Sequence, residues 1–224
     1  MEQRRDSATA YIILADGFET IEALTPLDVL RRCGVEVTTI SLNKTRAVRS
    51  SHGVIVEADA TMEDFMHNCN CCASGTGTGN AGTSSTAGSS STAGSTSTTA
   101  SSAVRQALIL PGGYPGYKNL CESAEVGALI TQFHKEGKLL CAICGAPTAL
   151  KANQICRGAA ITCHTSVKEE LSDYYSILSS AVVKYMNIIT GMGAGRSLEF
   201  AFAIAEALTS KEKVEEIKAK MEII

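Results

Sequence analysis

One cysteine lies where an apolar run ends abruptly, and its position favours reactivity. Residues 139–150 read LLCAICGAPTAL. The run before Cys144 suits a buried strand, and small residues and a helix-forming stretch follow it, which is the plan of a nucleophile elbow. Backbone N–H groups and the helix dipole at a helix N-terminus favour an anion, and such a position can lower a cysteine pKa from about 8.5 to ~3.5–7.5. The pattern therefore predicts a nucleophilic thiolate at Cys144.

Three other groups follow predicted strands and are expected to meet this thiol. Glu22 comes shortly after the first apolar run, at 11–15, and His164 comes directly after the run at 160–163. Ligands of parallel α/β sheets bind beyond the carboxyl ends of the strands, so these side chains are placed at one edge. Glu22, poorly solvated beside a thiolate, is expected to have a raised pKa and to donate a hydrogen bond to the sulfur. His164 is expected to serve as a base or proton shuttle.

Glycines at the same edge are expected to supply backbone donors. Gly112 and Gly113 follow the predicted strand at 107–110, and Gly145 follows the cysteine. Glycine allows close backbone approach, and N–H groups aimed at a developing negative charge stabilise it. The amides of Gly113 and Gly145 therefore form a candidate oxyanion hole.

The elements that must position these groups alternate between apolar strands and helices. This alternation predicts one doubly wound α/β domain, with a mostly parallel sheet covered on both faces. Pro26 predicts a kink or a late start in the first helix. The expected strands are 11–15, 35–42, 107–110, 139–143, 160–163 and 186–190, and a hairpin is expected over 48–58. The expected helices are 20–33, 61–66, 123–136, 195–208 and 211–221, together with one from after residue 144 to about 152 and a short one from 166.

Composition narrows the function classes. The 224 residues carry a net charge of −3, which gives no electrostatic footprint for nucleic acid. No apolar run approaches the ~18 residues of a membrane span, and the N-terminus lacks the apolar region of a signal peptide, so a cytoplasmic protein is expected. The nine cysteines are odd in number and are interpreted as reduced thiols.

A low-complexity tract that is almost entirely Ser, Thr, Gly and Ala fills residues 74–103. It has no charged, aromatic or large aliphatic residue and cannot bury enough surface to offset its ordering entropy. We expect a flexible insertion within a single domain that spans residues 1–224.

Other features of the sequence admit other chemistry. Cys141 and Cys144 form a CxxC spacing, but Cys141 falls inside the strand, whereas a dithiol redox pair needs both sulfurs near one helix start. The run 191–195 reads GMGAG, and we expect a tight turn beside the pocket whose amides could hold an anionic group. Soft metal ligands cluster at His67, Cys69, Cys71 and Cys72, without an evident second half of a tetrahedral site.

Five motifs together resemble the ThiJ/PfpI superfamily, and within it the branch of the Parkinson-disease protein deglycase. They are ADGFETIEALTPLDVLRRCGVEV, LILPGGYPGYKNL, CAICGAPTALKAN, ITCHTSVKEEL and TGMGAGRSLEFAFAIAEAL, in this order, from about residue 10 to 218. The resemblance implies a flavodoxin-like fold, a homodimer and no cofactor. It places the functional cysteine, glutamate and histidine on Cys144, Glu22 and His164, and the oxyanion amides on Gly113 and Gly145.

The chain departs from this branch at three positions, and it differs from the peptidase-like members of the superfamily at a fourth. Thr165 stands where proline often follows the histidine, and His52 stands where animal members hold an arginine near the pocket. Glu57 occupies a position where some members carry a peripheral cysteine. Peptidase-like members have a histidine directly after the cysteine, where this chain has Gly145. A protease triad of that kind is therefore missing.

Two functions remain open. The first is a cofactor-free glyoxalase or deglycase that acts on small reactive carbonyls such as methylglyoxal and glyoxal or their early adducts. The second is a sensor of oxidative stress, or a redox-regulated chaperone, in which Cys144 is oxidised to a sulfinate beside Glu22. Both use the same residues.

Overall fold

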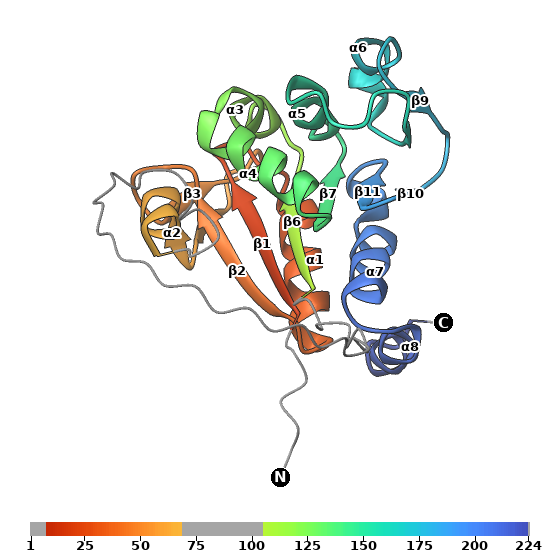
Figure 1. The fold of residues 1–224 in the computed structure, drawn as a ribbon. Coiled ribbons are helices and arrows are strands. Elements are labelled where there is room, and N and C mark those ends of the chain that lie inside the picture. Colours follow the sequence, from red (N-terminus) through yellow and green to blue (C-terminus); the bar gives the residue numbers. More distant parts are fainter. Residues whose placement is uncertain (1–7, 69–104, 224) are drawn as a thin grey trace, which may run out of the picture.

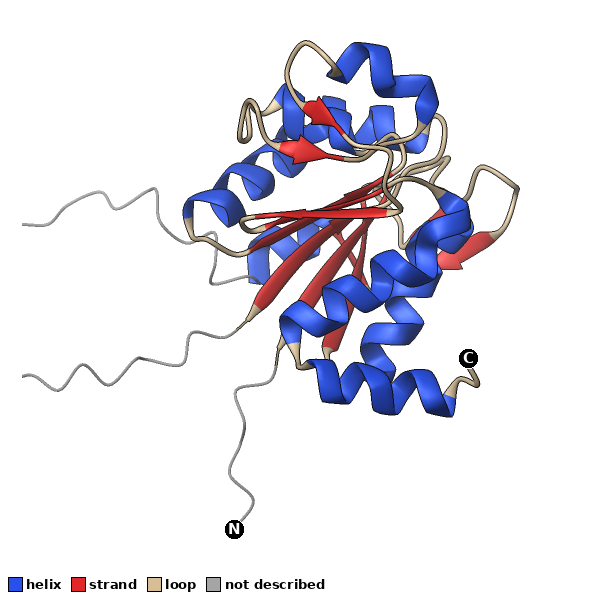
Figure 2. Ribbon diagram, turned by 90° about the vertical axis from the view of Figure 1, so that its right-hand side faces the viewer, coloured by secondary structure: helices blue, strands red, loops and turns tan. Residues whose placement is uncertain are grey.

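The computed structural model describes residues 8–68 and 105–223, which form a central β-sheet with helices on both faces (Figures 1 and 2). Seven strands of this part pair in the order β10-β11-β7-β6-β1-β2-β5. Every neighbouring pair is parallel except β10 and β11. The doubly wound, mostly parallel sheet is thus confirmed. Its strands are β1 (Thr9–Leu14), β2 (Glu36–Ser41), β5 (Ala60–Thr61), β6 (Gln106–Leu110), β7 (Leu139–Ile143), β10 (Val182–Tyr185) and β11 (Ile188–Gly191).

The central strands are apolar throughout because both faces of the sheet are covered. Successive side chains of a strand point to opposite faces, so in β1 Ile12 joins one buried cluster and Ile13 joins the other. Helices α1 (Thr20–Arg32), α7 (Ser197–Leu208) and α8 (Lys211–Lys220) contribute to the first cluster. The opposite face is covered by α2 (Met62–Asn68), α3 (Gly116–Glu122), α4 (Ala124–Lys135) and α5 (Pro147–Ala152), with α6 (Lys168–Leu171) and Tyr175 at its edge.

Three details differ from the sequence-based expectation. Helix α1 starts at Thr20 and runs through Pro26, so the expected late start is wrong. Helix α3 and the antiparallel edge strand β10 were not predicted. The strand expected at 160–163 is only β8 (Ala160–Ile161), which pairs with β9 (Ser176–Ile177) outside the main sheet. It ends early because the next N–H, that of Thr162, donates to the Thr190 hydroxyl at 2.9 Å instead of to a neighbouring strand.

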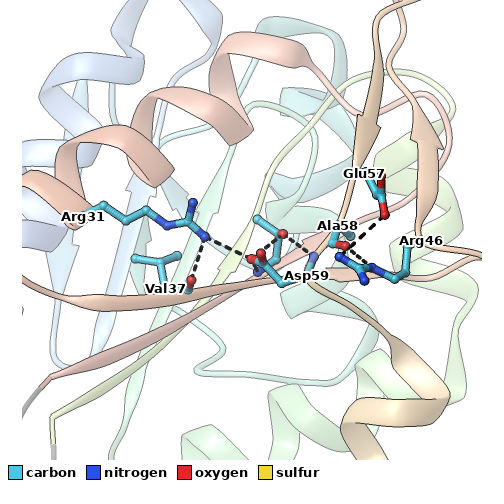
Figure 3. Close-up of polar contacts among 7 residues, drawn as sticks. Arg31, Val37, Arg46, Glu57, Ala58 and Asp59 are labelled. Carbon is cyan, nitrogen blue, oxygen red and sulfur yellow. Dashed lines mark hydrogen bonds and ion pairs between the residues drawn. The ribbon is translucent and has the colours of Figure 1, made fainter.

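The predicted hairpin is confirmed, and hydrogen bonds of Asp59 and Arg46 hold its end against the sheet. Strands β3 (Ala47–Arg49) and β4 (Ile55–Glu57) pair antiparallel, and β5 follows at once. Between β4 and β5, the Asp59 carboxylate accepts hydrogen bonds from the Thr39 N–H and hydroxyl, both at 2.8 Å, and from Arg31 of α1 at 3.0 Å (Figure 3). Arg46 donates to the carbonyl of Ala58 at 2.6 Å. One aspartate thus links β2, α1 and the chain leaving the hairpin.

Some expectations fall outside the described residues or stay predictions. The tract 74–103 and the candidate ligands Cys69, Cys71 and Cys72 lie outside them, and the single-domain organisation and the homodimer stay predictions. Of the helices in residues 8–68 and 105–223, none has the length and apolar character needed to cross a bilayer. The cysteines in these ranges are all free thiols.

Candidate active site

Cys144 occupies the turn between β7 and α5, in a backbone conformation that is rare for a residue with a side chain. Its φ is +64°, in the left-handed region, and such outliers cluster at functional sites. Two hydrogen bonds hold the turn: the Cys144 N–H donates to Gly191 at 3.0 Å, and its carbonyl accepts from the His164 N–H at 2.9 Å. The strand, sharp turn and helix predicted from the sequence are therefore present, and the end of β11 and the loop after β8 hold the thiol-bearing residue between them.

Glu22 lies in the first turn of α1 with no exposed surface. Its Oε2 atom accepts a hydrogen bond from the Gly112 N–H at 2.8 Å, whereas its buried Oε1 atom has no hydrogen-bond partner among the described residues. Burial raises the pKa of this carboxyl to about 7, although the Gly112 N–H and the Cys144 thiol lower it, and the charge of Glu19 adds to the rise. The shift has the direction predicted from the sequence.

The predicted lowering of the Cys144 pKa is wrong. Burial raises the pKa of the thiol to about 12, and the charge and hydrogen bond of Glu22 add to the rise, while the amides of Gly113 and Gly145 lower it. Burial and the facing carboxylate outweigh the amides. Helix α5 has six residues and begins only at Pro147, so its dipole adds little at the sulfur.

These two shifts belong to one coupled pair. Two like charges in a poorly solvated site repel, so Glu22 and Cys144 together hold at most one negative charge near neutral pH, and they acquire it as the pH rises through about 7. When the proton is on Glu22, the sulfur is the anion and receives hydrogen bonds from the carboxyl and from the Gly113 and Gly145 amides. A thiolate thus exists here only together with a protonated Glu22.

Glycine is required where the backbone approaches this pair. A Cβ atom on Gly112 would lie 2.6 Å from the Cys144 Cβ and 2.7 Å from Glu22 Oε2. Gly113 has a φ of +90°, and a Cβ there would lie 2.3 Å from the Glu19 nitrogen. A Cβ on Gly145 would lie 2.7 Å from the Tyr117 ring. Larger residues at these positions would push the amides away from the thiol and the carboxyl.

His164 reaches the site from the loop after β8 and not from the main sheet. Its Nδ1 accepts the Ser166 N–H at 3.2 Å and lies 2.8 Å from the Ser166 hydroxyl. A ring nitrogen that accepts an amide proton carries none, so the neutral ring holds its proton on Nε2. This geometry favours His164 as a hydrogen donor at Nε2, and the base role expected from the sequence requires that proton to leave first.

One cavity of about 440 Å³ brings most of the predicted residues together. Glu22, Gly113, Cys144 and His164 line it, and Gly112 and Gly145 lie directly behind this wall. The GMGAG run lines it as well, which confirms the turn expected beside the pocket. Sequence reasoning missed Glu19 and Arg196, which also line the cavity. The only sequence signal for these two residues was their nearness in sequence to predicted parts of the site. Glu19 directly precedes the first helix, and Arg196 directly follows the glycine-rich run.

The alternative centres gain no support from the described residues. Cys141 is fully buried within β7, and burial raises the pKa of its thiol, so it is a poor partner for a dithiol pair with Cys144. Within residues 8–68 and 105–223, no group of three or more His, Cys, Asp or Glu side chains converges as metal ligands would.

A doubly wound sheet that presents a cysteine on a strand-to-helix turn beside a buried glutamate defines a class of flavodoxin-like α/β proteins. The chain belongs to the DJ-1/PfpI family, whose profile matches residues 8–207. It is 33% identical to protein dj-1beta of Drosophila melanogaster over 94% of this chain and 95% of that protein. The crystal structure of Drosophila melanogaster DJ-1beta aligns with a TM-score of 0.78 at 32% identity, covering 97% of this chain and 99% of that one. A relative from Caenorhabditis elegans, named glutathione-independent glyoxalase DJR-1.2, is 39% identical over 47% of this chain and 56% of its own length.

Proposed function

We propose that the protein is a cysteine-dependent glyoxalase that converts small α-oxoaldehydes, such as methylglyoxal and glyoxal, into 2-hydroxy acids. The observation that carries the proposal is the contact between a fully buried carboxyl with a pKa of about 7 and the cavity-lining thiol of Cys144. Such a carboxyl can give and take protons at neutral pH, which is what an isomerisation through an enediol needs. The relative named as a glyoxalase supports the same reaction class.

In the first step, the Cys144 sulfur attacks the aldehyde carbon of methylglyoxal. A carbon–sulfur bond forms, and the proton of the pair, carried by Glu22, passes to the aldehyde oxygen to give a hemithioacetal. The amides of Gly113 and Gly145 lie close enough to the sulfur to donate to the oxygen on the adjacent carbon. As negative charge moves from the sulfur to the aldehyde oxygen, the same two amides can stabilise it on either atom.

In the second step, the pair moves a hydrogen from one carbon to the next. The carboxylate of Glu22 removes the proton on the former aldehyde carbon, and the ketone oxygen takes up the negative charge while it accepts a hydrogen bond from the His164 Nε2–H, which gives an enediolate. The hydroxyl proton then passes to the neighbouring negatively charged oxygen, and Glu22 returns its proton to the former ketone carbon. The product is a thioester of lactate on Cys144, with no net gain or loss of electrons.

In the last step, water attacks the thioester carbon, and the carbon–sulfur bond breaks. Glu22 takes one proton of the water, and the sulfur leaves as the thiolate, which restores the starting pair of a thiolate and a protonated Glu22. The product is lactic acid, so the sum is methylglyoxal plus water giving lactate and a proton. Glu22 gives or takes the proton at each carbon and at the water.

A test measures loss of methylglyoxal and formation of lactate by the wild type and by Cys144→Ser, with Cys141→Ser as the matched control. Cys141 lies on β7, the strand that leads to Cys144, but it is buried outside the cavity. We expect turnover by the wild type, retention in Cys141→Ser, and a loss of about 10³-fold or more in Cys144→Ser. Equal turnover by Cys144→Ser and the wild type would refute the proposal.

A second function, redox sensing at Cys144, is favoured by the unpartnered Oε1 atom of Glu22. A protonated carboxyl there can donate to an oxygen on an oxidised sulfur. Two molecules of hydrogen peroxide would oxidise the thiolate first to a sulfenic acid and then to a sulfinate, and would themselves be reduced to water or hydroxide. If fresh, reduced protein turns over neither methylglyoxal nor glyoxal while peroxide adds two oxygens at Cys144, this second function replaces the first.

A further inference from the structure

The cavity at Cys144 is larger than a three-carbon aldehyde requires. Its volume of about 440 Å³ falls in the range of sites that hold much larger ligands, ~300–1,000 Å³. A substrate whose aldehyde carbon reaches the Cys144 sulfur therefore leaves space over the turn formed by Met192, Gly193 and Ala194. The chemistry of the residues around that space bears on what else the substrate carries.

The charged side chains that line the cavity differ in how they are engaged. Glu19 accepts a hydrogen bond from the Ser51 hydroxyl at 3.1 Å and lies 3.3 Å from His52 Nδ1. Only 16% of the Glu19 side chain is exposed, so its carboxylate is already engaged by the hairpin. His164 lies beside Gly193, with 3.4 Å between the His164 Cδ2 and a Cβ built on the glycine.

Arg196 is the only lysine or arginine among the described residues that line the cavity. It ends the 3-10 turn η2 (Ala194–Arg196), which the Arg196 N–H closes by donating to the Gly193 carbonyl at 2.8 Å. The turn therefore fixes the arginine backbone three residues after Gly193, on the short segment that lines the cavity together with Cys144, Glu22 and His164.

The guanidinium of Arg196 is accessible to a ligand. It contacts Glu199 at 3.0 Å, and the two side chains are 54% and 47% exposed. An ion pair this exposed is weak because water screens it and because holding two flexible side chains in place costs entropy. An incoming carboxylate can compete for the planar fork of the arginine and offer it two parallel hydrogen bonds.

We propose that Arg196 makes the enzyme prefer α-oxoaldehydes that carry an anionic group, such as a carboxylate, at the end remote from the aldehyde. This inference rests on the proposed glyoxalase function and names the substrate class of that site. The aldehyde end reacts at Cys144 as methylglyoxal does, and addition of water gives the corresponding 2-hydroxy acid. The anionic end lies toward Arg196 and away from Glu19.

The test compares two substrates in the full-length protein. One is neutral methylglyoxal, and the other is 4,5-dioxopentanoate, an α-oxoaldehyde with a carboxylate two methylene groups from its ketone. The variants are Arg196→Gln, Arg196→Lys and, as a matched control, Arg32→Gln. Arg32 also forms an exposed ion pair on a helix, with Asp28 at 2.7 Å, but it is not among the cavity residues.

For Arg196→Gln we expect the ratio of kcat/KM for the anionic substrate to kcat/KM for methylglyoxal to fall about tenfold, mainly through the KM of the anionic substrate, because one charge-assisted contact is lost. Arg196→Lys keeps the charge and loses the fork, so it should fall in between, and Arg32→Gln should match the wild type. If Arg196→Gln has the same ratio of the two kcat/KM values as the wild type, the inference is overturned, and the glyoxalase function still stands. Failure of the wild type to convert either substrate would remove the proposed function and this inference with it.

Discussion

Two carboxylates, Asp59 directly after the hairpin and Glu22 in the first turn of α1, have opposite environments. Asp59 is almost half exposed, and its Oδ2 atom accepts hydrogen bonds from Thr39 and Arg31 (Figure 3). Burial raises the pKa of Asp59, but the Thr39 donors and the charges of Arg31 and Arg46 together lower it below its usual value. Glu22 is fully buried, has one backbone donor and one unpartnered oxygen, and has a pKa raised to about 7.

The comparison separates a carboxylate that stabilises the fold from one that costs stability. The Asp59 carboxylate has hydrogen-bond donors and positive charges around it, so it stays ionised near neutral pH. Glu22 is poorly satisfied as an anion, so a proton moves on and off it at neutral pH with little free-energy change. A protein retains such an unfavourable group where chemistry requires it.

The largest expected difference between the two is in catalysis. Glu22→Gln removes the group that carries protons between carbons and should lower kcat/KM for methylglyoxal by about 10²–10⁴-fold. Asp59→Ala lies outside the cavity and should leave kcat/KM unchanged. Steady-state kinetics of both variants checks this, and the contrast between the carboxylates breaks down if Glu22→Gln is as active as Asp59→Ala.

A smaller loss of kcat/KM should follow from disturbing the one backbone N–H, that of Gly112, that donates to Glu22. Gly112→Ala places a methyl group 2.6 Å from the Cys144 Cβ and 2.7 Å from Glu22 Oε2, so one of these groups must shift. A displacement of this kind should lower kcat/KM by about 10²-fold. Gly195→Ala is the control, because a Cβ there meets nothing within 4 Å. Equal kinetics of the two alanine variants would show that the close contact at Gly112 does not position the pair.

Stability should respond to pH in a way that identifies Glu22. The folded-state pKa of about 7 exceeds the ordinary 4.5, so the folded protein binds the proton more tightly and Glu22 destabilises it increasingly as pH rises between these values. The free energy of unfolding of Glu22→Gln minus that of the wild type should therefore grow by about 3 kcal/mol from about pH 4.5 to above about pH 7. Urea unfolding across this range measures it, and a difference independent of pH would contradict the raised pKa.

Asp59 should show the reverse sign and a smaller effect. Asp59→Ala leaves the buried Thr39 donors and Arg31 without their acceptor and should lower the free energy of unfolding by about 2 kcal/mol at neutral pH. Because the folded-state pKa of Asp59 is lowered, this contribution is present above the ordinary value of 3.8 and is lost as pH falls below it. Asp173→Ala, which removes an exposed ion pair with Lys151, is the control and should cost at most about 0.5 kcal/mol.

The sequence predicts the central sheet and much of the site because both depend on local pattern. The apolar runs of β1, β6 and β7 are long enough to be read directly, and the residues that end them fall at one edge by topology. Strand β10 was not predicted because its apolar run is interrupted by Lys184 and Tyr185, which are exposed. Helix α3 was not predicted because it is short and begins at a glycine after proline.

The properties that the sequence could not supply depend on tertiary contacts. The pKa of Cys144 is raised first because the folded chain buries the thiol and second because Glu22, distant in sequence, faces it; the sequence showed only the turn. Arg196 lines the cavity because η2 brings residues 194–196 to the same cavity as Cys144, and its place after the glycine-rich run was the one sequence signal for this. Placement of groups at an edge was predictable, whereas their solvation was not.

The central claim is that Cys144 and Glu22 share one proton, and the pH dependence of Cys144 alkylation tests it most directly. Rates with iodoacetamide, read at Cys144 by mass spectrometry, should rise with a midpoint near pH 7 in the wild type, where the pair first becomes negative. In Glu22→Gln the pair has one site fewer from which to lose that proton, so the midpoint should move to higher pH. A wild-type midpoint at the ordinary thiol value of about 8.5, unmoved by Glu22→Gln, would contradict the account.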